Sequence, residues 1–137
     1  MGLILDSSAV IAAERRGQNV AQFLKQVVAA TGDQRAVLSS VGLTELVHGI
    51  HRAQSSQARG RRESFVRELL NDVEVYPYTK ATALLAGRID GEQQNAGVTI
   101  PFADLLIGAT ALEVDYFLLT VNVRHFRLIP GLTVVQL

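Results

Sequence analysis

The sequence predicts an α/β fold in which helices cover both faces of a central, largely parallel sheet. Short apolar runs alternate along the chain with longer segments of helical period. Several of the short runs are apolar throughout, which is typical of strands buried on both faces. A strand followed by two helices occurs three times in a row, and two strands end the chain. Together these observations predict an α/β/α sandwich.

The N-terminal segments give the first repeat of this pattern. Residues 2–6 (GLILD) are expected to form a strand, and a helix over 8–15 follows a serine that can cap it. Residues 18–31 carry apolar side chains at the spacing of one helix face. The apolar run 36–40 (AVLSS) is the second expected strand.

The middle of the chain gives the next pair of helices and a third strand. Helical patterns are expected over 43–54 and 59–71. The small and polar stretch 53–62 (AQSSQARGRR) between them is typical of a loop inside a domain. Residues 73–78 (VEVYPY) are then expected to form a strand.

The C-terminal segments complete the sheet. Helices are expected over 79–95 and 102–114, and the second of these is the most apolar helix of the chain. The runs 116–120 (YFLLT) and 132–137 (LTVVQL) are the last two expected strands.

Size and composition restrict the class of protein. With 137 residues, of which 48% are hydrophobic, we expect one domain over residues 1–137. The formal net charge is zero, so recognition of a charged partner must be local. There is no cysteine, which excludes disulfides and thiolate metal sites. No apolar run approaches the roughly 20 residues of a membrane span, and no leader precedes the first strand, so we expect a cytoplasmic protein without a membrane partner.

Polar side chains follow the expected strands where a parallel sheet binds its ligands. Asp6, Ser7 and Ser8 come directly after the first strand. Glu45 lies in the first turns of the helix after the second strand, and Asn122 comes just after the strand ending at Thr120. Asp104 begins the apolar helix before that strand. Because ligands bind outside the carboxyl ends of parallel strands, these side chains form the candidate site.

Carboxylates gathered at one edge of a sheet repel one another unless a cation neutralises them. Oxygen ligands without cysteine favour a hard ion such as Mg²⁺ or Mn²⁺. Local interpretations remain open for each residue. Asp6 and Ser8 are also typical helix caps, and Asp104 also suits a helix dipole. Glu45 also suits a capping arrangement with upstream serines.

Other polar residues are expected to lie outside the site. Glu113 is nine residues after Asp104 and therefore on the opposite helix face. Acidic residues in polar stretches are expected at the surface, namely Asp90, Glu92 and Glu14. The histidines are expected to be a turn or rim residue (His125) and surface or packing residues (His48 and His51).

Basic residues form one local excess of positive charge, comprising Arg52, Arg59, Arg61, Arg62 and Arg67. This cluster suits a nucleic-acid backbone, an acidic protein segment or simply a solvated surface. A further set of arginines is a candidate rim for the site, comprising Arg15, Arg16, Arg88 and Arg124.

The sequence resembles the PIN-domain ribonucleases and, among them, the VapC toxins of toxin–antitoxin systems. Four motifs carry the resemblance in the family's order over essentially the whole chain, namely LILDSSAVI, SSVGLTELVHGI, TIPFADLLIGATALE and LLTVNVRHFRLIPGLTVV. The resemblance implies a PIN-like fold and a Mg²⁺-dependent endoribonuclease, with Mn²⁺ as an alternative ion. It also implies inhibition of translation, a VapB-type antitoxin and a homodimer.

Carried over residue by residue, the resemblance implies that Asp6 and Asp104 bind the metal and that Glu45 is a third catalytic acid. Ser8 and Thr120 would orient the acids. Many members have a further acid where this chain has TVNVRHF. Here that segment offers Asn122, the fourth candidate catalytic residue, and His125. An amide oxygen is a weaker ligand than a carboxylate, which disfavours a second metal ion.

Two other classes with acids after a strand do not fit. A receiver domain needs an acidic pair and a late lysine, whereas the only lysines are Lys25 and Lys80. A haloacid-dehalogenase-type phosphatase needs an aspartate at position 8, which is Ser8. A non-catalytic PIN-like binding module remains an alternative, as does a PIN nuclease that acts in RNA processing or on DNA.

Overall fold

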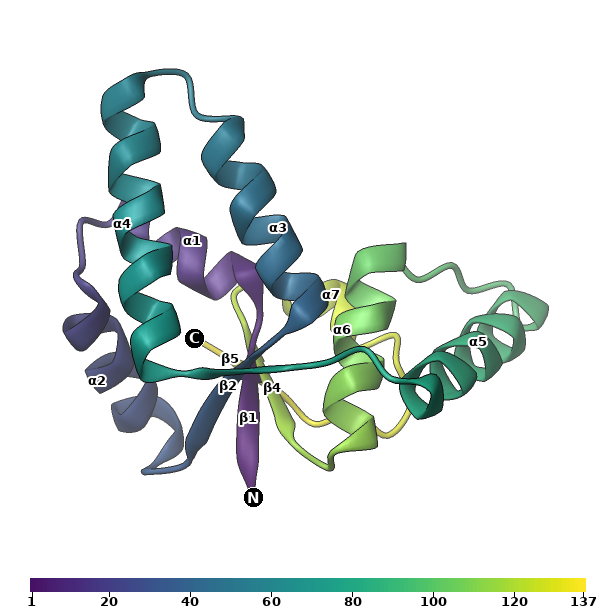
Figure 1. Ribbon diagram of the computed structural model, residues 1–137. Coiled ribbons are helices and arrows are strands. Elements are labelled where there is room, and N and C mark those ends of the chain that lie inside the picture. Colours follow the sequence, from purple (N-terminus) through teal and green to yellow (C-terminus); the bar gives the residue numbers. More distant parts are fainter.

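Five parallel strands form the centre of the protein, as a computed structural model describes it for residues 1–137 (Figure 1). The strands run in the spatial order β3-β2-β1-β4-β5, and every neighbouring pair is parallel. Their bounds are β1 Gly2–Leu5, β2 Arg35–Ser39, β3 Glu74–Tyr76, β4 Phe117–Thr120 and β5 Val134–Gln136. The structure therefore confirms the predicted parallel sheet and all five expected strands.

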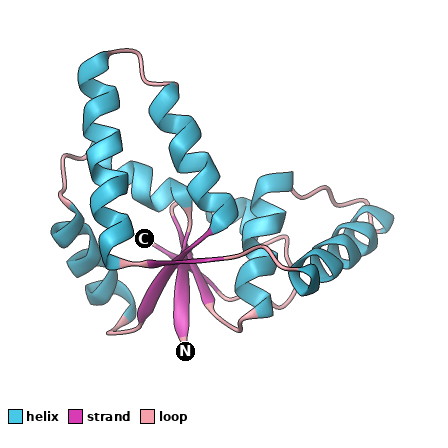
Figure 2. Ribbon diagram, in the orientation of Figure 1, coloured by secondary structure: helices cyan, strands magenta, loops and turns pink.

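Seven helices surround the sheet (Figure 2). Their bounds are α1 Ser7–Arg15, α2 Val20–Thr31, α3 Ser40–His51, α4 Ser56–Asp72, α5 Lys80–Asn95, α6 Phe102–Glu113 and α7 Val123–Phe126. None of them is both long enough and apolar enough to cross a membrane. The predicted helices are confirmed, and α7 is an additional helix that the sequence did not predict.

The two faces of the sheet carry separate hydrophobic cores. On one face, Leu3 and Leu5 of β1 pack with buried residues of α1, α2, α3 and α4, including Phe23. On the other face, Ile4 packs with residues of α5, α6 and α7, including Ile107 and Phe126. Successive residues of β1 thus point to opposite cores. This arrangement explains why the strand is apolar at every position.

Helix capping shifts two of the predicted boundaries. Helix α3 begins at Ser40 because the Ser39 side chain accepts a hydrogen bond from the Gly42 N–H at 2.9 Å. Helix α4 begins at Ser56, where the Ser55 side chain accepts from the Ala58 N–H at 3.1 Å. The predicted loop over 53–62 is therefore wrong from Ser56 onwards, because a serine cap starts the helix within it.

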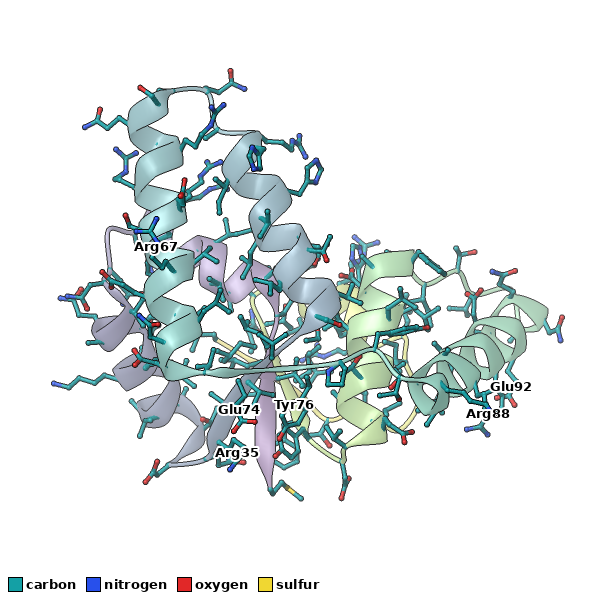
Figure 3. The ribbon with its side chains drawn as sticks, viewed as in Figure 1. Arg35, Arg67, Glu74, Tyr76, Arg88 and Glu92 are labelled. Carbon is teal, nitrogen blue, oxygen red and sulfur yellow. The ribbon has the colours of Figure 1, made fainter.

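A cluster of polar side chains, separate from the candidate site, lies beside β2 and β3. Arg35 and Glu74 form an ion pair of 2.9 Å, and the hydroxyls of Tyr76 and Tyr116 lie 2.9 Å apart. Figure 3 shows Arg35, Glu74 and Tyr76 gathered there. A Cβ atom added to Gly2 would lie 2.5 Å from the Arg35 carbonyl oxygen and 2.7 Å from the Tyr116 ring. Glycine is therefore required where β1 enters the sheet.

The register of the strands determines which polar residues meet. Leu5 pairs with Leu119, so the residues that follow them, Asp6 and Thr120, lie side by side at the carboxyl edge of the sheet. The backbone N–H of Asp6 donates to the Leu119 carbonyl at 2.9 Å, which extends the strand pairing by one residue. The start of α3 is at the same edge, because β2 is the other neighbour of β1.

Candidate active site

Asp6 is buried at the carboxyl end of β1, with only 3% of its surface exposed. Its Oδ2 atom accepts hydrogen bonds from the hydroxyls of Ser8, at 2.5 Å, and Thr120, at 2.8 Å. Its Oδ1 atom is also buried but has no hydrogen-bond partner. Asp6 precedes α1 at the N-cap position, yet its side chain makes no capping hydrogen bond. Asp6 therefore occupies the cap position of α1, but its side-chain hydrogen bonds go to the hydroxyls of Ser8 and Thr120.

Burial raises the pKa of the Asp6 carboxyl, because the charged form loses its hydration. The hydroxyls of Ser8 and Thr120 oppose this effect by hydrogen-bonding the carboxylate, and the negative charge of Asp104 adds to it. The hydrogen bonds of the protein therefore do not fully offset the cost of burying the ionised Asp6 carboxylate. A buried carboxylate oxygen without a partner is costly unless an additional positive group meets it.

Glu45 lies on α3 and is held by a residue of α1. The Ser7 hydroxyl donates to Glu45 Oε1 at 2.8 Å. Burial raises the pKa of Glu45, the bond from Ser7 opposes this, and the charges of Asp6 and Asp104 raise it further. The interpretation of Glu45 as a capping partner of upstream serines is wrong, because Ser39 caps the helix through the Gly42 N–H instead.

Asp104 stands in the first turn of α6, where the helix dipole favours a negative charge. Its side chain is 16% exposed, and its Oδ2 lies 2.8 Å from His125 Nδ1 on α7. The charge of Asp104 acts on both Asp6 and Glu45. The fold therefore brings all three predicted acids into one electrostatic site.

The three acids share one arrangement. The side chain of each acid is hydrogen-bonded through one carboxylate oxygen. The other oxygen has no side-chain partner; this oxygen is Oδ1 in Asp6 and Asp104 and Oε2 in Glu45. No three histidine, aspartate or glutamate side chains lie close enough together to form a ready set of metal ligands. Mg²⁺ typically takes one or two carboxylates and completes its shell with water and substrate phosphate. The unpartnered Oδ1 of Asp6 fits such an ion.

The segment after β4 adds two residues to the edge of the site. The backbone N–H of Asn122 donates to Thr120 Oγ1 at 2.9 Å, and its side-chain nitrogen lies 3.2 Å from His125 Nδ1. His125 therefore contacts a site carboxylate, which the sequence-based expectation of a turn or rim residue did not include. The sequence held one signal for this contact: His125 is three residues after Asn122, a spacing that places two side chains close together on a helix.

A polar groove continues from Glu45 along α1, α3 and the start of α4. Arg15, Arg52 and Arg62 line it together with His48. Arg62 also donates to the Gly49 carbonyl at 2.8 Å, whereas Arg15 and Arg52 form no ion pair. The groove thus places positive charge beside the acidic site.

Not all of the predicted basic residues share this groove. Arg67 pairs with Glu63 at 3.1 Å on the outer side of α4, and Arg88 lies beside Glu92 on the outer side of α5 (Figure 3). Arg61 is 3.9 Å from Glu14, whose side chain is only 13% exposed. The expectation that Glu14 lies at the surface is therefore wrong, because it faces a small apolar pocket between α1 and α4.

Comparison with known proteins assigns the family. A family model described as the PIN domain matches residues 3–131. Ribonuclease VapC of Rickettsia bellii is 32% identical over 134 residues, which cover 98% of this chain and 95% of the relative. The chain is a PIN-domain protein of the VapC family. The membership of the VapC family that four short motifs predicted is therefore confirmed.

Solved structures show the same fold. The VapBC2 complex of Rickettsia felis bound to promoter DNA aligns with a TM-score of 0.86 and 20% identity, covering 100% of this VapC-type chain and 99% of that chain. VapBC-5 of Mycobacterium tuberculosis, a member of the VapBC family of toxin–antitoxin systems, aligns with a TM-score of 0.79 and 22% identity, covering 100% of both chains. The PIN-like α/β/α fold is thereby confirmed.

Replacing Asp6 with asparagine is expected to stabilise the protein at neutral pH in the presence of a chelator. Because the pKa of Asp6 is raised by folding, the folded state binds a proton more tightly than the unfolded chain, and stability falls as pH rises from about 4 through the raised pKa. Because asparagine does not ionise, the Asp6→Asn protein does not lose stability in this way as the pH rises. Its midpoint of thermal unfolding should exceed that of the wild type by a few degrees at pH 7.5, and the gain should shrink towards pH 4.

Asp33→Asn is the matched control, because Asp33 is exposed on the loop before β2. It should leave the unfolding midpoint unchanged at both pH values. An Asp6→Asn protein less stable than the wild type at pH 7.5 would contradict the assignment of Asp6 as an uncompensated buried charge.

Proposed function

We propose that this protein is a divalent-cation-dependent endoribonuclease and the toxin of a toxin–antitoxin pair. One observation carries the proposal: three carboxylates lie at the carboxyl edge of the sheet, each anchored through one oxygen, and Asp6 Oδ1 is buried without a partner. The naming of the Rickettsia bellii relative as a ribonuclease and the VapBC complexes among the solved neighbours support the same conclusion.

The residues of the site suit Mg²⁺, with Mn²⁺ as an alternative. Asp6 and Asp104 would hold the ion through their unanchored oxygens, and the hydroxyls of Ser8 and Thr120 keep the other oxygen of Asp6 occupied. When bound, the ion would supply Lewis-acid polarisation of a phosphodiester and a lowered pKa for water. Neutralising the carboxylates would also remove the repulsion among them.

Glu45 is the group placed to accept a proton. Its Oε1 is occupied by Ser7, so Oε2 is the atom that would take the proton of the attacking water. Burial and the two aspartates raise its pKa, which makes the carboxylate a stronger base. The oxygen of water would bond to phosphorus while the bond from phosphorus to O3′ breaks. O3′ would take a proton from solvent, leaving a 3′-hydroxyl and a 5′-phosphate.

The groove beside Glu45 suits the RNA backbone. Arg15 and Arg52 line it without an ion-pair partner, so their charges are available to phosphates on one side of the scissile bond. The net charge of the chain is zero, which leaves this local charge as the source of attraction. Cleavage of RNA in the cytoplasm would inhibit translation.

Two protein partners belong to the proposal. A VapB-type antitoxin would bind the apolar pocket lined by Val10, Leu46 and Phe65, which adjoins the basic groove. A homodimer would bury the most exposed large apolar side chains other than Met1, which are Leu84 (68% exposed) and Phe102 (69% exposed). They lie on α5 and at the start of α6.

Cleavage of total cellular RNA by the antitoxin-free protein is expected to require both the cation and Asp6. Asp6→Asn and chelation should each lower the rate by about a hundredfold or more, since several kcal/mol of transition-state stabilisation depend on the ion. The measurement is the rate of fragment formation with Mg²⁺, with Mn²⁺ and with EDTA. Asp33→Asn is the folded control and should cleave like the wild type.

The same assay separates the alternatives. Equal rates for the wild type and Asp6→Asn would contradict catalysis by this site and favour a non-catalytic binding module. Cation-dependent cleavage of DNA but not of RNA would indicate a DNA-directed PIN nuclease. Cleavage restricted to precursor RNA would indicate a role in RNA processing.

Binding of RNA is expected to depend on the groove arginines. In an Asp6→Asn background, which prevents cleavage, Arg52→Ala or Arg15→Ala should weaken binding and lower the slope of log affinity against log salt by about 1 each. Fluorescence anisotropy with a labelled RNA over a range of salt concentrations measures both quantities. Arg67→Ala is the control, because Arg67 is already paired with Glu63 on the outer side of α4. An unchanged slope in the groove variants would contradict the proposed path of the backbone.

A further inference from the structure

Asp6 and Asp104 are connected by a continuous chain of contacts through the segment after β4. Thr120 donates to Asp6 Oδ2 at 2.8 Å, and the backbone N–H of Asn122 donates to the same Thr120 hydroxyl at 2.9 Å. The Asn122 side chain lies 3.2 Å from His125 Nδ1, and that nitrogen lies 2.8 Å from Asp104 Oδ2. Two acids from different elements are thereby joined by one short segment.

The direction of these bonds follows from the groups involved. An ionised carboxylate can only accept, so the proton of the His125 contact must be on Nδ1. The same nitrogen then cannot accept from the Asn122 amide nitrogen. A half-turn of that amide places its oxygen at the same position, where it shares the Nδ1 proton. In this arrangement Asn122 and Asp104 both contact the imidazole at Nδ1, and Asn122 gives the ring a second point of support.

The backbone that carries the imidazole is fixed, although the ring itself is 39% exposed. Phe126, the next residue, is fully buried in the core shared by α5 and α6. Asp104 has no other side-chain hydrogen bond, and it belongs to a different helix. His125 is thus the only side chain that restricts rotation of the Asp104 carboxylate by hydrogen bonding.

We propose that His125, braced by Asn122, is a positioning residue that holds Asp104 through Oδ2 and directs Oδ1 towards the cation. The proposal rests on the proposed function, because it concerns the cation of that site. It assigns a role to Asn122: the side-chain amide supports the imidazole. His125 acts on the ion through Asp104 and does not itself ligate it.

The affinity of the full-length protein for Mn²⁺, measured by titration with electron paramagnetic resonance, tests the proposal independently of cleavage. Loss of a group that orients a metal ligand typically weakens metal binding 10–100-fold, so His125→Ala should raise the dissociation constant by about tenfold or more. His125→Asn should restore affinity close to the wild-type value, because the asparagine amide nitrogen takes the position of Nδ1. His51→Ala, at an exposed histidine at the end of α3, should have no effect.

The role of Asn122 is tested by a double-mutant cycle. Asn122→Ala alone should weaken Mn²⁺ binding, and adding it to His125→Ala should weaken binding no further, because Asn122 acts through the imidazole. Saturating Mn²⁺ should return the cleavage rate of His125→Ala towards that of the wild type. A merely structural defect would not be restored by the ion.

Several results would overturn the proposal. The first is a wild-type affinity for Mn²⁺ in His125→Ala, and the second is an equal loss of affinity in His125→Ala and His125→Asn. The third is that the losses of affinity caused by Asn122→Ala and His125→Ala add fully in the double mutant. The fourth is a spectrum of bound Mn²⁺ that shows a directly coordinated histidine nitrogen. Each leaves the nuclease assignment intact if the wild type binds Mn²⁺ and cleaves RNA. A wild type that binds no Mn²⁺ would overturn the proposed cation site and this proposal together.

Discussion

The buried carboxylate of Asp6 is the constraint on which the rest of the site depends. One of its oxygens is satisfied by Ser8 and Thr120, and the other is buried without a partner. An isolated charge in this position is unfavourable, and the nearby charge of Asp104 makes it more so. A buried polar atom without a partner calls for an explanation in a folded protein, and the proposed cation would supply one.

The parallel sheet explains how one small domain assembles this site. The carboxyl ends of β1, β2 and β4 lie at the same edge, so Asp6, the start of α3 and Thr120 become neighbours. The anchoring groups come from different elements: Ser7 from α1 holds Glu45 of α3, and His125 of α7 holds Asp104 of α6. The geometry of Glu45 and Asp104 is therefore fixed by tertiary packing rather than by their own helices.

The sequence predicted the strands, six helices and the candidate acids because each has a local signal. Buried parallel strands are apolar throughout, and Asp6 directly follows one of them. The contacts of Glu45 and Asp104 were not predictable in this way, because Ser7 and His125 are 38 and 21 residues away from them along the chain. Helix α7 has four residues, which is too short for a helical period, and Glu14 is covered by α4, which only the folded chain reveals.

The central claim is that the acids form one cation site completed through Asp6 Oδ1 and Asp104. The most direct measurement is the anomalous diffraction of a crystal of the wild-type protein soaked with Mn²⁺. The account predicts a single strong peak within coordination distance of Asp6 Oδ1 and of Asp104, with Ser8 and Thr120 still bonded to Asp6 Oδ2. A peak elsewhere, or an Asp6 Oδ1 that remains without a partner at saturating Mn²⁺, would contradict it.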